Sequence, residues 1–201
     1  MPLVGIRPWS CSRPARARGS CSTNCTLRRS AARSERRMFV YRASRRPRVS
    51  FDPLDVSASV ARDGWRFNDK ATPILYAAEV QALAILEVVS RPGWSGIQEL
   101  TIAVLEIPDG SVVDLEDLNL LLPTNWNVRP VGPNAQSLAG EFLAEVDRAA
   151  LAGRQICGLR VPSVISTTDC TVLLDPRQRE AYATADWVRV PFHWLVETAT
   201  S

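Results

Sequence analysis

A single carboxylate lies in a stretch that is otherwise almost entirely apolar. Glu87 is the only charged residue of "QALAILEVV", residues 81–89. At about 3.6 residues per turn, a helix here surrounds Glu87 with Val80, Leu83 and Ala84 and leaves it no broad polar face. An unpaired buried carboxylate is costly, so it takes up a proton or finds a cation and hydrogen bonds. Glu87 is therefore a candidate catalytic residue, and the alternative is a helix-end carboxylate that reaches solvent.

Three other side chains are candidates for the same site. Arg66 lies between two aromatic residues in "GWRFN", and a fixed guanidinium can grip a phosphate or carboxylate through two donors. Tyr76 lies among apolar residues, either as part of the core or as a ring beside a ligand. Ser163 follows a proline in "RVPSVISTT", where a turn can expose its hydroxyl. The alternatives are a surface arginine, a core tyrosine and a turn-forming serine.

Several familiar chemistries find no support. Neither the G-x-G-x-x-G nor the P-loop pattern occurs, and the one histidine, His193, lies in an apolar context that argues against a Ser-His-Asp triad. The spacing of Cys11, Cys21 and Cys25 is not that of a zinc site, so we expect no metal. The remaining cysteines, Cys157 and Cys170, are expected to be buried reduced thiols in a reducing compartment.

The charge of the chain is unevenly distributed. Residues 1–37 contain nine arginines and one glutamate, a net charge of +8, so the overall +3 leaves −5 for the rest. This extension has no apolar periodicity and is expected to be disordered. It could be a transit peptide, a nucleic-acid-binding arm, or untranslated sequence upstream of a start at Met38. The chain has no run of about 18 apolar residues, so we expect no membrane span.

The elements that must position the candidates follow from periodicity and turn residues. Alternation in 72–78 predicts a strand with Ile74 and Tyr76 on one face and Leu75 and Ala77 on the other. The predicted elements are strands at 38–44 and 99–110, a long loop at 50–73, a helix at 78–91, a helix at 134–153 with Asn134 as N-cap and Gly153 as its stop, and three strands within 155–176 and 186–194. Residues 111–128 stay unassigned. This order predicts a single α+β domain.

Taken together, these stretches resemble the RES domain family, the toxin half of RES-Xre bacterial toxin-antitoxin pairs. The likeness runs from Met38 to Trp194 and is carried by "YRAS", "GWRFNDKATPILYAAEVQALAILEVV", "AQSLAGEFL" and "LRVPSVISTTDCTVLLDPRQ". It implies an ADP-ribosyltransferase-like fold over 38–196, followed by a short tail at 197–201.

The resemblance also implies roles for particular residues. Glu87, Arg66, Tyr76 and Ser163 match the family's active-site positions, and Arg42, Arg66, Tyr76 and Asn134 are expected to bind substrate. The family often has Ser or Thr where Asn134 and Ala135 stand, and Asn where Thr171 and Asp175 stand. An acid at position 175 beside a dinucleotide phosphate would weaken binding.

The implied activity is cytoplasmic degradation of NAD, by hydrolysis or phosphorolysis of its nicotinamide-ribose bond. NAD is then a substrate, and no cofactor is expected. The implied partner is an Xre-like antitoxin protein; no membrane or nucleic acid is expected for the domain itself, and a homodimer is left open. The alternatives are a protein ADP-ribosyltransferase and an inactive binding protein whose basic arm contacts nucleic acid.

Overall fold

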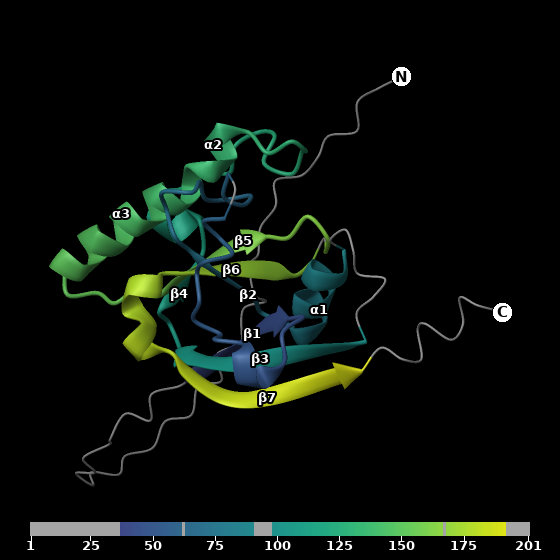
Figure 1. The fold of residues 1–201 in the computed structure, drawn as a ribbon. Helices are drawn as coiled ribbons and strands as arrows, with labels where there is room; N and C mark the ends of the chain where they lie inside the picture. Colours follow the sequence, from purple (N-terminus) through teal and green to yellow (C-terminus); the bar gives the residue numbers. More distant parts are fainter. Residues whose placement is uncertain (1–36, 62, 91–97, 167, 192–201) are drawn as a thin grey trace, which may run out of the picture.

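The chain folds around one seven-stranded sheet with the order β4-β5-β6-β2-β1-β3-β7 (Figure 1). The computed structural model describes residues 37–61, 63–90, 98–166 and 168–191. The strands are β1 (Arg37–Ser44), β2 (Leu75–Ala78), β3 (Glu99–Pro108), β4 (Val112–Val113), β5 (Gly158–Pro162), β6 (Cys170–Leu174) and β7 (Ala183–Pro191). The helices are α1 (Gln81–Val89), α2 (Pro133–Gln136) and α3 (Leu138–Leu151), with 3-10 turns η1 (Arg48–Ser50), η3 (Glu116–Leu118) and η4 (Pro176–Ala181). The predicted α+β class is confirmed.

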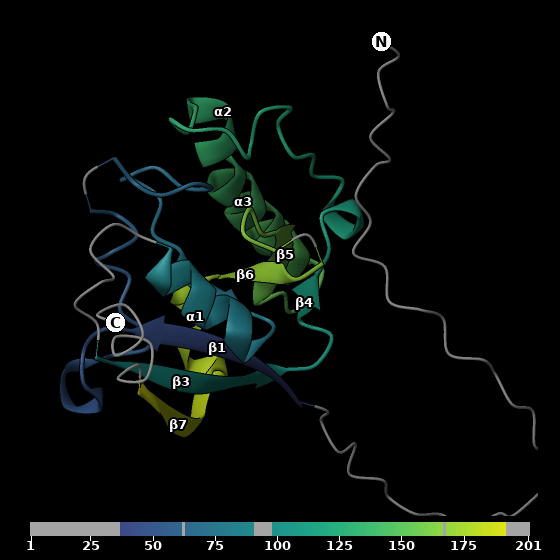
Figure 2. The same ribbon diagram turned by 90° about the vertical axis from the view of Figure 1, so that its right-hand side faces the viewer.

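Different elements pack on the two faces of the sheet. On one face α3 packs on β5 and β6, and α1 packs on β1 and β2 (Figures 1 and 2). The opposite face holds a second apolar cluster, which is covered by the loop after β1 and by η4 through Leu54, Val56 and Tyr182. Alternation along each strand therefore decides which side chains lie beneath the helices.

The predicted alternation around Tyr76 is confirmed. Ile74 and Tyr76 belong to the cluster beneath α3, and Leu75 and Ala77 belong to the cluster on the other face. The predicted strands at 38–44 and 99–110 and the three near the end of the chain correspond to β1, β3, β5, β6 and β7. The unassigned residues 111–128 contain only β4 and η3, which are too short to leave a periodic signal.

The predicted helix at 134–153 is divided, and its predicted N-cap is wrong. Gly132 caps α2, Pro133 occupies its first turn, and Asn134 therefore lies inside the turn with an exposed side chain. Ser137 separates α2 from α3. The stop is confirmed, because Gly153 has a φ of +73° immediately after the cap residue of α3.

The two cysteines of the domain differ. Cys157 is buried and free, as predicted, whereas Cys170 is disulfide-bonded, so the expectation of a reduced thiol is wrong there.

Several predictions concern residues outside those that the structure describes. These are the N-terminal cysteines, the basic extension up to residue 36, the turn at 91–94 and His193. Arg37, which was assigned to the extension, begins β1. The helices in the described part of the chain are all too short or too polar to cross a bilayer.

Candidate active site

Glu87 lies on the packed side of α1. No side chain caps the N-terminus of this nine-residue helix, so its stability comes from packing of its apolar face. Leu83 and Ala84, one turn before Glu87, are buried against Ala78 of β2. The same stripe carries the half-buried Glu87 towards the sheet, where its Oε1 accepts a hydrogen bond from Ser163 Oγ at 3.3 Å. The carboxylate therefore has a partner that the helix itself does not provide.

Ser163 is fixed where β5 ends. Its side chain is buried, its N–H donates to Asp169 O at 3.4 Å, and its Oγ accepts from Ile165 N at 3.1 Å. The hydroxyl has one proton, which is directed to Glu87. This local hydrogen bonding explains why a serine after a proline stops the strand and orients a carboxylate at the same time.

Tyr76 presents its ring rather than its hydroxyl. The hydroxyl donates to Asn68 Oδ1 at 2.8 Å and accepts from Phe67 N at 3.1 Å. The ring centroid lies 5.1 Å from that of Trp65. Because both hydroxyl functions are used within the protein, the ring is the part of Tyr76 that is suited to contact a ligand.

Asn68 is the residue that holds this arrangement together. It is completely buried, and its Nδ2 donates to the carbonyls of Ser59, Asp69 and Thr72 at 2.9, 2.7 and 2.9 Å. Asn68 was not among the predicted site residues. The only signal was its place directly after the aromatic residue in "GWRFN".

The loop that carries Arg66 is closed tightly. Gly64 has a φ of +82°, and a Cβ at this position would lie 2.2 Å from Asn68 O, so only glycine fits. Gln136 of α2 donates to Asp63 O and Trp65 O at 2.8 and 3.0 Å. The first turn of α3 adds a bond from Ala139 N to Phe67 O at 2.9 Å. The two helices therefore set the position of Arg66.

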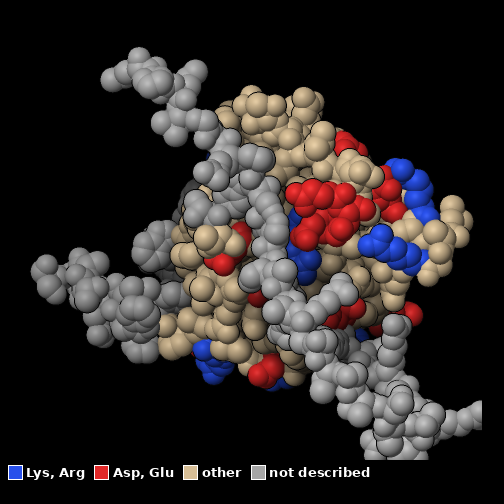
Figure 3. Space-filling model, turned by 180° about the vertical axis from the view of Figure 1, so that it is seen from behind, with Lys and Arg blue, Asp and Glu red and all other residues tan. Residues whose placement is uncertain are grey.

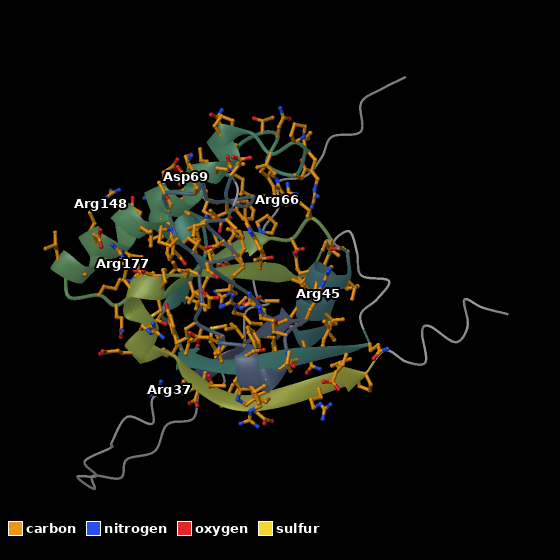
Figure 4. All side chains as sticks on the ribbon, in the orientation of Figure 1. Arg37, Arg45, Arg66, Asp69, Arg148 and Arg177 are labelled. Atoms are coloured by element: carbon orange, nitrogen blue, oxygen red, sulfur yellow. The ribbon has the colours of Figure 1, made fainter. Side chains whose placement is uncertain are left out.

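Arg66 is held by carbonyls rather than between its neighbouring rings. Its Nη1 donates to Trp126 O at 2.7 Å and to Val128 O at 3.5 Å. Phe67 stacks on the Trp126 ring at 6.0 Å, and Trp65 packs on Tyr76. Figure 4 shows Arg66 well away from Arg148 and Arg177. The flanking aromatic residues therefore anchor the loop that carries Arg66.

The charges of the site act on one another. Burial lowers the pKa of Arg66, the charge of Arg129 lowers it further, and Glu87 and Tyr76 oppose these effects. Among the described residues Arg66 and Glu87 form no direct ion pair, so the two charges attract one another without neutralising each other by contact. The structure thus brings together Glu87, Ser163, Arg66 and Tyr76, from a helix, a strand end, a loop and a strand.

Arg42 and Asn134, the other two predicted substrate-binding residues, are placed differently. Arg42 alternates with Tyr41 and lies on the face of β1 opposite to α1. Its guanidinium donates to the carbonyls of Pro53 and Asp55 and lies 6.0 Å from the Phe51 ring centroid. Burial lowers its pKa to about 10, and Asp55 and Asp52 oppose that effect. In the described residues no contact joins Arg42 or the exposed Asn134 to the four.

Asp175 does not face the predicted substrate region. β6 begins beside Ala78, where Thr171 pairs with it, and Asp175 follows the far end of the strand. Its carboxylate is buried and accepts from Arg177 N and Nε, each at 2.9 Å. Both residues line a surface cavity of about 510 Å³ at the C-terminal end of α3. Asp175 is therefore paired with Arg177 at the end of β6 away from Thr171 and Ala78.

Outside residues 1–37 the chain carries a net charge of −5, and its charged side chains are of both signs. Seen from behind, acidic side chains gather beside basic ones (Figure 3). Within the part of the chain that the structure describes, His, Cys, Asp and Glu side chains form no group of three that could hold a metal ion.

Comparison with known proteins relates this chain to a family. A family model described as the RES domain matches residues 39–194. The chain is 30% identical to the Prs ADP-ribosylating toxin of Sphingobium sp. (strain YBL2) over 135 residues, which cover 66% of this chain and 79% of that protein. It is 29% identical to Toxin Res of Yersinia enterocolitica serotype O:8 / biotype 1B (strain NCTC 13174 / 8081) over 117 residues, 58% of this chain and 70% of that protein.

Proposed function

Because this chain belongs to the RES domain family, we propose that it is the toxin of a toxin-antitoxin pair and that it degrades NAD. The reaction is cleavage of the nicotinamide-ribose bond, with water or phosphate as the acceptor. The observation that carries the proposal is the carboxylate of Glu87, which is oriented by the hydroxyl of Ser163 and lies within the electrostatic reach of Arg66.

The chemistry fits a fixed carboxylate. When the bond breaks, its electron pair goes to the ring nitrogen, nicotinamide leaves neutral, and positive charge develops on the ribose. A carboxylate stabilises that charge, as in the oxocarbenium-like transition states of glycosidases. Water or phosphate then bonds to the ribose carbon and loses a proton. An apolar surround strengthens the field of Glu87, which explains its place in an apolar helix.

The other residues position the substrate. Arg66 has N–H donors left after binding Trp126 O and can hold a phosphate of the dinucleotide. The Tyr76 ring can stack on the nicotinamide or its ribose. Ser163 keeps one carboxylate oxygen of Glu87 in place. Such orientation can contribute about 7 kcal/mol or more to lowering a barrier.

The proposed partner is an antitoxin protein, because one relative is named Toxin Res. The resemblance to RES-Xre pairs implies that this antitoxin is Xre-like. The net charge of −5 outside the extension favours a partner with a basic surface.

The decisive experiment is to incubate the full-length protein with NAD and measure free nicotinamide. Cell-free synthesis avoids arrest of an expression host. Free ADP-ribose indicates hydrolysis, and a phosphorylated ADP-ribose formed only in phosphate buffer indicates phosphorolysis. Intact NAD after incubation with folded protein would refute the proposed function.

Transfer of ADP-ribose to a protein is the second candidate. It is favoured by the relative named as an ADP-ribosylating toxin. The same site would serve, because the ribose cation is common to both reactions and only the acceptor differs. NAD labelled on its adenine distinguishes the two reactions. In ADP-ribose transfer the label becomes attached to a protein of an added cell extract, whereas in NAD degradation it remains in a small molecule.

A further inference from the structure

The loop before α2 is attached to the candidate active site by hydrogen bonds to its backbone and by a contact between two rings. Arg66 Nη1 binds the carbonyls of Trp126 and Val128, and the Trp126 ring stacks on Phe67. Arg129 directly follows Val128. The backbone of Arg129 is therefore held next to the carbonyl of Val128 that binds Arg66. Its side chain begins close to Arg66.

Among the described residues Arg129 forms no ion pair with an acidic side chain, unlike several arginines elsewhere in the domain. Arg160 pairs with Glu79 and Asp114, and Arg177 pairs with Asp147 and Asp175. In the described part of the chain no carboxylate forms an ion pair with the exposed Arg129.

Arg129 and Arg66 instead act on one another, and the repulsion contributes to the lowered pKa of Arg66. Two cations that repel one another and form no ion pair with a carboxylate favour the binding of a doubly charged anion. The pyrophosphate of a dinucleotide carries two negative charges.

Arg42, which was expected to bind substrate, is unsuited to act as the second cation beside Arg66. Arg42 lies on the other face of β1, with its guanidinium bound to the carbonyls of Pro53 and Asp55. We infer that Arg129, on the loop fastened to Arg66, is the second cation that binds the pyrophosphate of NAD. This inference rests on the proposed function and identifies a binding residue of the same site.

The test compares Arg129→Gln with wild type in the full-length protein. Nicotinamide release should show a KM for NAD raised about five- to tenfold with kcat changed less than about twofold, because a lost charge contact to a remote phosphate weakens substrate and transition state equally. Added salt should reduce the difference in KM between Arg129→Gln and wild type, since exposed charges are screened. The matched control is Arg148→Gln, an exposed arginine on α3 far from Arg66, which should behave as wild type.

A second measurement separates this inference from the reaction. ADP has the pyrophosphate but no bond to cleave, so Arg129→Gln should weaken ADP binding in calorimetry by a similar factor. Unchanged KM and ADP affinity, or a fall in kcat alone, would overturn the inference. A wild-type protein that binds ADP through Arg129 but leaves NAD intact would overturn only the proposed reaction, and one that binds neither ligand would overturn both.

Discussion

Ser163 Oγ donates a hydrogen bond to Glu87 Oε1 over 3.3 Å, although 76 positions separate the two residues along the chain. One residue ends a strand and the other lies in a helix that packs on a neighbouring strand. Their contact therefore depends on the docking of α1 against the sheet. The catalytic carboxylate proposed here is oriented by tertiary structure, and the helix that carries it supplies no partner of its own.

Glu87→Gln should abolish NAD degradation while leaving the fold intact. The amide keeps the size of the side chain and can still accept from Ser163, but it lacks the negative charge that stabilises the ribose cation. Nicotinamide release should fall by at least about a hundredfold, a typical loss for removal of one stabilising group. The free energy of unfolding, measured in urea, should change by less than about 1 kcal/mol.

The control for this change is Glu116→Gln, which removes an exposed carboxylate from η3. It should retain full activity. NAD consumption by Glu87→Gln at the wild-type rate would exclude the proposed role of Glu87.

Ser163→Ala tests orientation separately from charge. Glu87 keeps its charge but loses the hydroxyl that holds Oε1, so kcat should fall by about tenfold, a smaller loss than for Glu87→Gln. The variant also removes the acceptor of Ile165 N, which should lower the free energy of unfolding by about 1 kcal/mol. Ser57→Ala, in an exposed loop, is the control. A kcat within twofold of wild type would show that Ser163 does not orient Glu87.

The sequence indicated where Tyr76 and Glu87 lie on their elements, but it gave no sign of the backbone contacts that support the candidate site. Alternation placed Tyr76 on one face of its strand, and helical periodicity left Glu87 without a polar face; both features are local and periodic. The role of Arg42 stays a prediction: the resemblance suggested only that an arginine stands there, whereas strand alternation puts its side chain on the face of β1 opposite to α1. The carbonyls of Trp126 and Val128 that bind Arg66 come from a segment with no periodic signal, since its contacts are made by backbone atoms.

The N-cap predicted at Asn134 shows that residue type alone does not fix where a helix begins. A polar residue before an apolar periodic run is a good N-cap by type, but Pro133 already has the fixed φ of a first helical residue, so the helix begins earlier. No sequence pattern marks Asn68 as buried, because an asparagine in a loop is usually exposed. Only the fold shows it to be completely buried and bound to Tyr76.

Tyr76→Phe should lower stability more than activity. The Tyr76 hydroxyl is used by Asn68 and Phe67 N, so its removal leaves a buried acceptor and a buried donor without partners. The free energy of unfolding should fall by about 1–3 kcal/mol, while kcat per folded molecule should stay within about threefold because the ring remains. Tyr76→Ala, which removes the ring, should raise KM by at least about tenfold. If Tyr76→Phe alone abolished catalysis at full stability, the hydroxyl rather than the ring would be the functional part.

Asp175→Asn should affect stability and not substrate binding. The buried carboxylate binds the backbone and guanidinium of Arg177, and the amide can keep the first contact but not the charge pairing. Because the Arg177 side chain is half exposed, the loss should be about 1–3 kcal/mol, at the low end for a broken buried pair. The KM for NAD should not change, since Asp175 lies at the end of β6 away from Thr171 and Ala78. Asp147→Asn removes the exposed partner of Arg177 and should cost at most about 1 kcal/mol. A lower KM in Asp175→Asn with unchanged stability would mean that this acid does act on the bound dinucleotide, and would contradict the placement of the substrate beside Glu87 and Arg66.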